Sequence, residues 1–449
     1  MDKLKQYLKN IDEIVSLTID PDGPGAIRIH LVPPFKIVFG IPWTIIINGY
    51  HMLPINTSWA ILIHEFILEV HKQGKSVFSN KDRELVDNNV ITRMIELFPR
   101  AERKTIKSDL DDILDTLYDI AKGKEPNLYI GYMPLSKAAK YLKAPHRVDL
   151  MISSLRVDGM WNCNQNCKLC YAAKGDEASS DEIDTNSWKQ IIDNLHKSGV
   201  SQLTFTGGEP TLRDDLVELV SYSKWFVTRL NTNGVKLTSS LCKDLYDASL
   251  DSVQITLYSA NKNIHNILVG KDNYDATIEG IKNALNANLN VSINTPLCSL
   301  NKDYVDTIKF LHQLGISYFT CSGVIETGNA TNAKDEYLTR DALYELLKQA
   351  TDYCYQNNLE IDFTSPGQID DERLKELKLT IPSCGACLSN MAIAPNGDVL
   401  SCQSSLDDNL GNVLKESLSS IYKSSKCRKI RNRSAKDEHK CYLSSKEEI

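Results

Sequence analysis

Three cysteines, Cys163, Cys167 and Cys170, stand closer together along the chain than any other three of its 12 cysteines. Three thiolates at this spacing can hold one corner of an iron–sulfur cubane, and because such a cluster normally takes four thiolates, one iron stays open. Zinc is the main alternative, since close cysteine pairs also form zinc sites, but those sites usually bring two pairs. The triplet therefore predicts a [4Fe–4S] cluster, with zinc or plain packing as less favoured interpretations.

A second cysteine group has the pattern Cys384-x2-Cys387-x14-Cys402. The segment between the last two reads as a β-hairpin with an Asn396-Gly397 turn, which would bring Cys402 back beside the pair. This group is a second candidate metal site, and a zinc knuckle is the alternative.

The composition limits what kind of protein can carry these cysteines. A chain of 449 residues accommodates two to four domains at about 150 residues each. The net charge of −7 gives no electrostatic basis for a nucleic-acid partner. No run approaches the ~20 apolar residues that span a bilayer, and the first residues lack the apolar stretch of a secretion signal. We expect a cytoplasmic protein with no membrane partner, in which clustered cysteines bind metal rather than form disulfides.

Strand-like and helix-like segments alternate from about residue 148, which predicts a parallel sheet built from right-handed βαβ units. In such sheets the active site lies in the loops that follow the carboxyl ends of the strands. The cysteine triplet follows the first strand directly. The expected strands are Leu150–Val157, Gln202–Thr206, Phe226–Asn231, Ser252–Leu257, Asn290–Asn294 and Tyr318–Cys321.

Polar motifs stand at the ends of the next strands. Gly207-Gly208-Glu209-Pro210 closes the second strand, and Asn231-Thr232-Asn233-Gly234 closes the third. Glycines let backbone approach a ligand, and a carboxylate can pair with an ammonium group. Taken singly, each motif is more simply a turn or a strand-end cap. Their position at successive strand ends favours a binding site.

Together these motifs resemble the radical S-adenosylmethionine (SAM) superfamily, whose signature is Cys-x3-Cys-x2-Cys after the first strand of a partial barrel. The resemblance covers about residues 148 to 335. It implies a cofactor pocket in which the Gly-Gly-Glu stretch binds the amino group of the methionine moiety. Tyr171 is implied as an aromatic contact, because Leu169 stands where the superfamily usually has an aromatic residue. Thr256 is implied as the ribose contact, and Ser259 is the alternative to it. The other implied cofactor contacts are Pro210, Thr232, Asn233 and Asn294.

The resemblance also implies a mechanism. The open iron chelates the amino and carboxyl groups of SAM, and an electron from the reduced cluster breaks the C5′–S bond. The resulting 5′-deoxyadenosyl radical abstracts a hydrogen atom from a substrate. An electron donor such as flavodoxin or ferredoxin is then needed as a partner. Cys298 and Cys321, at or just beyond strand ends, could return a hydrogen atom to a substrate radical, although buried packing is the simpler interpretation.

The C-terminal cysteines resemble the auxiliary-cluster extension called SPASM or, in its shortened form, twitch. A later Gly411-Asn412 fits this pattern, whereas the dense cysteine run of the full motif is missing. We therefore expect one auxiliary [4Fe–4S] cluster on Cys384, Cys387 and Cys402. Its fourth ligand is Cys441 or, less favoured, Cys427, and an open site that binds substrate is a further alternative.

The predicted architecture is α/β: a partial (β/α)6 TIM-like barrel with an N-terminal α+β accessory domain and a small C-terminal iron–sulfur extension. The N-terminal strands and helices loosely resemble the winged-helix element that binds leader peptides. A dimerisation or structural cap is the alternative. The expected boundaries are 1–125 for the accessory domain, 126–147 for a linker, 148–335 for the core and 336–449 for the extension.

The leading functional prediction is a radical enzyme that modifies a ribosomal peptide by a thioether, a carbon–carbon link or epimerisation. The alternative is an enzyme of small-molecule cofactor synthesis of the haem or molybdopterin type. A non-enzymatic iron–sulfur electron carrier or redox sensor explains the strand-end motifs poorly.

Overall fold

The computed structural model describes residues 2–11, 15–19, 27–34, 42–49, 51–74, 80–121, 144–153, 156–157, 160–161, 163–173, 182–437 and 439–443. The chain forms two compact units, Met1–Leu142 and Lys143–Ile449. Most of the expected linker lies outside the described residues. No described helix is both long and apolar enough to cross a membrane.

The first unit is built on a four-stranded antiparallel sheet with the order β1-β2-β3-β4. β1 and β4 are its edge strands, since each pairs with one neighbour. β2 (Ile-Arg-Ile-His-Leu-Val) and β3 (Trp-Thr-Ile-Ile-Ile) are rich in β-branched residues and contain no typical turn formers, which suits a buried strand. The strands are β1 (Val15–Ile19), β2 (Ile27–Val32), β3 (Trp43–Ile47) and β4 (His51–Ile55).

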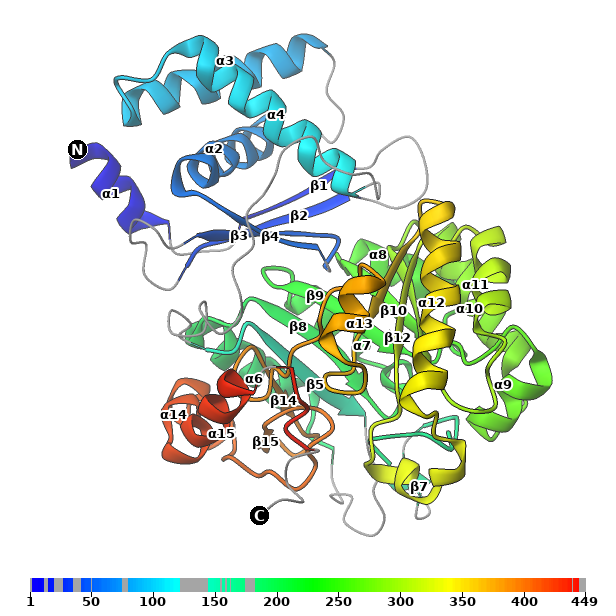
Figure 1. The fold of residues 1–449 in the computed structure, drawn as a ribbon. Coiled ribbons are helices and arrows are strands. Elements are labelled where there is room, and N and C mark those ends of the chain that lie inside the picture. The colour runs from blue at the N-terminus through cyan, green and yellow to red at the C-terminus, as the bar shows by residue number, and fades with distance from the viewer. Residues whose placement is uncertain are drawn as a thin grey trace. The chain divides into compact units, whose positions relative to one another are not determined.

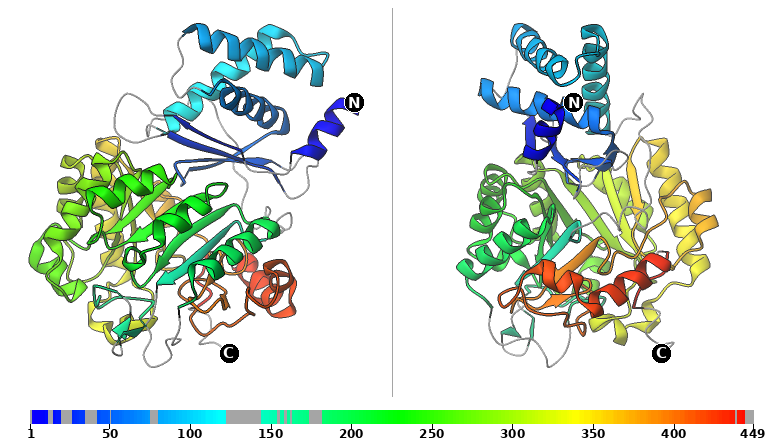
Figure 2. Two further views of the ribbon diagram at one scale, coloured as in Figure 1. Left: turned by 180° about the vertical axis from the view of Figure 1, so that it is seen from behind. Right: turned by 90° about the vertical axis from the view of Figure 1, so that its left-hand side faces the viewer.

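Helices cover one face of this sheet (Figures 1 and 2). The first long helix begins at Thr57, because the Asn56 side chain accepts a hydrogen bond from the backbone N–H of Trp59. Its apolar side packs with the sheet residues into one hydrophobic core. The helices are α1 (Asp2–Asn10), α2 (Thr57–Gln73), α3 (Asn80–Leu97) and α4 (Arg103–Ala121).

The second unit contains a nine-stranded sheet with the order β13-β12-β11-β10-β9-β8-β5-β14-β15. Its first eight strands in this order run parallel, and β15 is antiparallel to β14. The six strands predicted from the sequence are all present, with bounds shifted by a few residues. The strands are β5 (Arg147–Ser153), β8 (Gln202–Gly207), β9 (Val227–Thr232), β10 (Ser252–Thr256), β11 (Val291–Pro296), β12 (Tyr318–Ser322), β13 (Glu360–Phe363), β14 (Asn390–Ile393) and β15 (Val399–Leu400), with a separate pair, β6 (Arg156–Val157) and β7 (Met160–Trp161).

Helices connect the parallel strands and lie along the outer side of the sheet, as α10, α11 and α12 do in Figure 1. Leucines, isoleucines and valines of the strands pack with the helices there into a single core. The helices are α6 (Thr185–Ser198), α7 (Leu216–Tyr222), α8 (Ser239–Asp247), α9 (Lys262–Val269), α10 (Tyr274–Asn286), α11 (Tyr304–Gln313), α12 (Arg340–Gln356), α13 (Asp371–Glu376), α14 (Leu418–Lys423) and α15 (Ser425–Lys436), with short 3-10 turns at Pro210–Leu212, Gly328–Asn332 and Lys334–Glu336.

The sheet continues past residue 335, where the sequence suggested that the core ends. β13 adds to one edge beside β12, and the β14–β15 hairpin adds to the other edge beside β5. The hairpin has the Asn396-Gly397 turn expected from the sequence, with Gly397 at φ +84°. The C-terminal cysteine segment is therefore fixed to the same sheet that carries the first cysteine triplet.

Candidate functional site

The cysteine triplet lies in the loop 163–173 that follows β5 and the short β6–β7 pair. All three thiols are partly buried. Burial, and then the negative charges of Glu209 and Cys170, raise the pKa of Cys163 to about 12. Burial, followed by the charges of Cys170 and Cys163, also raises the pKa of Cys167. The thiols lie close enough to oppose each other's ionisation. The positive charge of bound iron would stabilise their thiolate forms.

No three cysteine, histidine or carboxylate side chains in the described part of the chain converge on a point that could hold a single metal ion. Three thiols close together on one loop fit ligands that each bind a different iron of a cubane, and a zinc site stays the alternative.

One side of this loop is held by the end of α9. The backbone N–H groups of Asn166 and Lys168 donate to the carbonyl oxygens of Val269 and Leu268, each at 2.9 Å. Gly270 follows with φ +65°, and a Cβ atom there would lie 2.6 Å from the carbonyl oxygen of Asn166. Only glycine permits both the backbone conformation and this approach.

The other side of the loop is held by residues 327–336. The backbone N–H of Asn329 donates to the carbonyl oxygen of Cys170 at 2.9 Å, and its side-chain Nδ2 donates to that of Cys167 at 3.1 Å. Lys168 forms an ion pair with Glu336 at 3.2 Å. The sequence offered no signal for Asn329, because its role depends on contacts more than 150 residues away.

Gly207 and Gly208 bring the end of β8 against the end of β5. Gly207 has φ +143°, and a Cβ atom at this position would overlap the backbone of Ser153. The backbone N–H of Gly208 donates to the carbonyl oxygen of Ser153. The glycines predicted from the sequence as a ligand cradle thus also join the two strand ends beside the triplet.

Glu209 is buried, with 1% of its surface exposed, and its carboxylate accepts several hydrogen bonds from other residues of the chain. Oε1 accepts from Thr232 Oγ1 at 2.6 Å and from the backbone and side chain of Thr211, while Oε2 accepts from the backbone N–H of Asn233 at 2.8 Å. Burial raises its pKa, against these hydrogen bonds. The side chain therefore fixes the third strand end, and only Oε2 keeps capacity for an ammonium group.

Asn233 connects that third strand end to the cysteine loop. Its Nδ2 donates to Asn164 Oδ1 at 2.6 Å and approaches Cys163 Sγ at 3.8 Å. Its carbonyl oxygen accepts from Thr277 Oγ1 at 3.0 Å. The predicted residue Asn233 thus meets the triplet directly, through an amide that can donate to a ligating sulfur, whereas the Thr232 hydroxyl is bound to Glu209.

Three further predicted cofactor contacts are placed differently. Thr256 and Asn294 are register partners on β10 and β11, both half-buried, and Asn294 accepts from Thr320 Oγ1 at 3.0 Å. Ser259 is fully buried and donates to Asp303 Oδ2 at 2.5 Å. Its hydroxyl is thus used as a link between loops, so Thr256 is the better placed of the two proposed ribose contacts.

Tyr171 lies between the two cysteine groups. It packs with Cys170 and with Leu400 of the hairpin. Burial, and then the charges of Cys170 and Asp149, raise the pKa of its phenol. This placement beside a ligating cysteine fits the cofactor-facing surface that the sequence suggested.

Cys298 and Cys321 occupy different environments. Cys321 is fully buried in the core between sheet and helices, on the same face as Phe319, so it does not face the cavity as expected from the sequence. The side chains of a strand alternate between its two faces, which explains the difference. Cys298 packs in a small cluster with Leu169 and Tyr258, next to Cys167. Neither placement adds support to the predicted hydrogen-atom transfer.

The C-terminal cysteines divide into two sets. The backbone N–H of Tyr442 donates to Cys384 Sγ at 3.4 Å, and burial together with the charges of Cys384 and Cys441 raises the pKa of Cys402 to about 12. The thiol of Cys427, on α15, is instead the main cause of the raised pKa of Cys387. Cys441 is therefore grouped with Cys384 and Cys402, whereas Cys387, a predicted ligand, is paired with the less favoured candidate.

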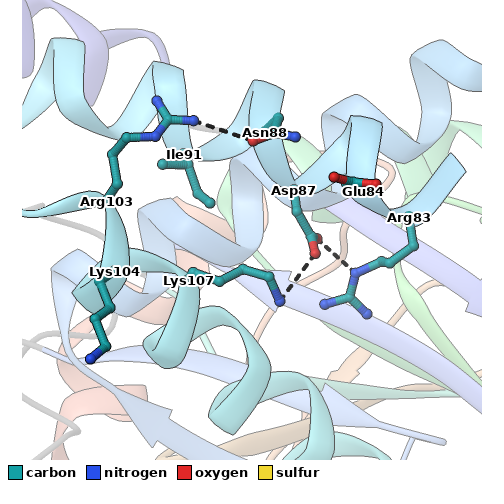
Figure 3. Close-up of a pocket in the computed structure, with 8 residues that line it drawn as sticks. All are labelled: Arg83, Glu84, Asp87, Asn88, Ile91, Arg103, Lys104 and Lys107. Atoms are coloured by element: carbon teal, nitrogen blue, oxygen red, sulfur yellow. Dashed lines mark hydrogen bonds and ion pairs between the residues drawn. The ribbon is translucent and has the colours of Figure 1, made fainter. Parts of the chain in front are cut away.

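A surface pocket of about 430 Å³ lies between α3 and α4 in the first unit (Figure 3). Asp87 accepts from Arg83 at 2.7 Å and pairs with Lys107 at 3.3 Å. Arg103 donates to Asn88 at 3.3 Å. These contacts join the two helices, and none of the predicted site residues lines the pocket.

Comparison with known families agrees with this geometry. Residues 162–311 match the radical SAM superfamily. The chain carries a radical SAM domain. Residues 384–443 match an iron–sulfur cluster-binding domain, the SPASM domain. The first match implies a [4Fe–4S] cluster and SAM as cofactors, and the second implies an auxiliary iron–sulfur cluster. Each match includes a cysteine group described above.

Three curated relatives match between about a third and a little over half of the chain. A probable GTP 3′,8-cyclase of Thermococcus kodakarensis is 29% identical over 36% of this chain and 54% of its own length. The mycofactocin maturase MftC of Mycolicibacterium smegmatis is 27% identical over 57% of this chain and 65% of its own. An AdoMet-dependent heme synthase of Oleidesulfovibrio alaskensis is 26% identical over 45% and 53%. The chain thus spans about half to two thirds of these relatives, all enzymes, which supports an enzymatic role.

Solved structures resemble more of the chain. Streptococcus suis SuiB bound to the precursor peptide SuiA is 16% identical, with a TM-score of 0.58 over 89% of this chain and 90% of that one. The enzyme anSMEcpe with bound AdoMet has a TM-score of 0.51 at 16% identity, over 63% of this chain and 82% of that one. At these identities the likeness concerns the fold, which is the predicted partial barrel with its iron–sulfur extension.

Proposed function

We propose that this protein is a radical SAM enzyme that modifies a peptide. The observation that carries the proposal is the meeting of the Cys163–Cys170 loop with the Gly207–Glu209 and Thr232–Asn233 strand ends at one edge of the sheet. When bound, the cluster and SAM supply the 5′-deoxyadenosyl radical that removes a hydrogen atom from the substrate.

The chain's own residues position this chemistry. Cys163, Cys167 and Cys170 hold the cluster, and the backbone of Gly207 and Gly208 provides a surface without side chains for the methionine moiety. Glu209 keeps Thr232 and Asn233 in place through buried hydrogen bonds. The buried surroundings of the three thiols keep water away from a reactive intermediate.

Two observations support a peptide as the substrate class. A structure of SuiB with a precursor peptide resembles the fold of most of this chain, and the maturase MftC is among the curated relatives. The first unit also has a small sheet with two edge strands, β1 and β4. An edge strand can take an extended peptide by β-augmentation, which would suit a leader segment.

A second candidate is synthesis of a small-molecule cofactor. It is supported by the GTP 3′,8-cyclase and heme synthase among the relatives. It gives no role to the sheet of the first unit.

The test of the chemistry is anaerobic reconstitution with iron and sulfide, reduction with dithionite and addition of SAM. We expect 5′-deoxyadenosine to form, and a variant with Cys163, Cys167 and Cys170 all changed to Ala to form none. Equal amounts from both proteins would disprove the proposal.

The test of the substrate class is coexpression with each short open reading frame next to the gene, followed by mass spectrometry of the peptide. A peptide mass that changes with the wild-type enzyme, and not with the triple-cysteine variant, supports peptide modification. Unmodified peptides together with turnover of GTP or a porphyrin would favour the second candidate.

A further inference from the structure

Gln165 stands between the first two cysteines of the triplet, and its side-chain amide contacts one of them. The thiol of Cys167 donates to Gln165 Oε1 at 3.4 Å. Only 8% of the Gln165 surface is exposed, and the amide nitrogen, Nε2, is buried with no hydrogen-bond partner among the described residues. The radical SAM resemblance gave Gln165 no role. A buried donor without a partner, next to a ligating sulfur, points to a bound state in which that donor is used.

The backbone on both sides of Gln165 is held by other elements. The carbonyl oxygen of Asn164 accepts from Asn273 Nδ2, just before α10, at 3.2 Å. The N–H of Asn166 donates to the carbonyl oxygen of Val269, at the end of α9, at 2.9 Å. Because both neighbours are fixed, the amide of Gln165 changes its orientation mainly by rotation within its own side chain.

Binding of iron changes what this amide faces. A thiol can donate its proton to Oε1, but an iron-bound thiolate has no proton, so lone pairs of the sulfur and of Oε1 would face each other. A half-turn about the last side-chain bond of Gln165 exchanges Oε1 and Nε2 and leaves the shape of the side chain unchanged. Nε2 then donates to the sulfur of Cys167. The oxygen that takes its former place is more readily left unpaired than an N–H group.

We propose that the side-chain amide of Gln165 donates a hydrogen bond to the iron-bound sulfur of Cys167 and thereby raises the reduction potential of the SAM-binding cluster. This inference rests on the proposed function. A donor to a ligating sulfur withdraws electron density from it and stabilises the reduced, more negative cluster. Asn233 Nδ2, at 3.8 Å from Cys163 Sγ, is a more distant donor of the same kind. Gln165 thus sets how readily the cluster accepts the electron that cleavage of SAM requires.

The test compares Gln165→Met with Gln202→Met, because each change replaces the amide of a buried glutamine by an apolar side chain of similar length. Gln202 is 4% exposed and begins β8, at the strand end opposite to Gly207. Each full-length protein is reconstituted with iron and sulfide, its iron is counted, and its reduced signal is followed by electron paramagnetic resonance at a series of potentials. The signal that changes on addition of SAM identifies the relevant cluster and separates it from the auxiliary one.

We expect Gln165→Met to shift the midpoint potential of that signal to a more negative value, and Gln202→Met to leave it at the wild-type value. An unchanged potential in Gln165→Met, or an equal shift in both variants, overturns the inference while the proposed function stands. A wild-type protein without a SAM-responsive signal overturns both.

A second measurement separates a hydrogen bond from an indirect effect on the loop. The protein is prepared with ¹⁵N in the side-chain amides of its glutamines, and pulsed electron paramagnetic resonance detects nitrogen coupled to the reduced cluster. We expect a ¹⁵N coupling on the SAM-responsive signal of the wild type and its loss in Gln165→Met; a coupling that persists in the variant refutes the inference. If Gln165→Met does not retain iron, the wild-type spectrum decides, because absence of the coupling there also refutes it.

Discussion

Gly270→Ala should detach the cysteine loop from α9, and the structure allows the size of this effect to be estimated. An alanine in the left-handed conformation of Gly270 costs about 1–2 kcal/mol. The new Cβ atom would also stand 2.6 Å from the carbonyl oxygen of Asn166, so the loop must move. Such a movement strains the hydrogen bonds of Asn166 and Lys168 to α9, at about 1 kcal/mol each. The expected total is about 3–4 kcal/mol.

Gly315→Ala provides the matched control. Gly315 also has a positive φ, +100°, and lies in the same unit, but a Cβ atom there meets nothing within 4 Å. It should therefore lose only the conformational part, about 1–2 kcal/mol. Urea unfolding measured by circular dichroism compares the two variants, and iron counting after reconstitution reports the triplet. We expect Gly270→Ala alone to lose about four iron atoms per chain. Equal unfolding midpoints and full iron in both variants would refute the reasoning.

Three further predictions follow from the buried groups. Glu209→Gln should destabilise the protein by about 2 kcal/mol and reduce formation of 5′-deoxyadenosine. An amide NH2 in the place of Oε2 would face the backbone N–H of Asn233, and one in the place of Oε1 could not accept the hydrogen bonds that Oε1 accepts. A wild-type urea midpoint in this variant would contradict the prediction. Burial and the charge of Asp362 raise the pKa of Glu360 to about 7, above its ordinary value of 4.5. Between these two pH values the folded protein keeps a proton on Glu360 that the unfolded chain releases. The free energy of unfolding should therefore fall as pH rises from about 4.5 to 7. Glu360→Gln should remove up to about 3 kcal/mol of that fall, measured by unfolding across this range, and an unchanged pH profile would count against it. Cys441→Ser should lose the auxiliary cluster, about four iron atoms, whereas Cys427→Ser should retain it, and equal losses would show that the grouping is wrong.

The order of the core elements could be predicted from the sequence because each strand is a short apolar run followed by a helix of regular period. The hairpin turn at Asn396-Gly397 was also predicted. β13 was missed, since Glu360–Phe363 is short and alternates acidic with apolar residues. Its place in the sheet depends on pairing with β12, which no local pattern indicates.

The direction in which a side chain points proved harder to predict than its position along the chain. Cys321 and Ser259 lie at or beyond strand ends, as expected, yet one faces the core and the other is bound to Asp303. A shift of one residue in a strand reverses the face that a side chain occupies. Loop side chains such as Ser259 depend in addition on the partner that the neighbouring loop presents.

The sequence alone determined the chemistry of this protein, because ligand spacing within eight residues and glycines at strand ends are local properties. Cys163, Cys167 and Cys170 and the Gly207–Glu209 segment could be identified without coordinates. The tertiary structure decided how these parts are held. Contacts between residues far apart in the chain join Glu209 to Thr232 and Asn233, and join Asn329 to the backbone of Cys167 and Cys170. Such partners depend on the packing of whole elements, which local sequence patterns do not specify.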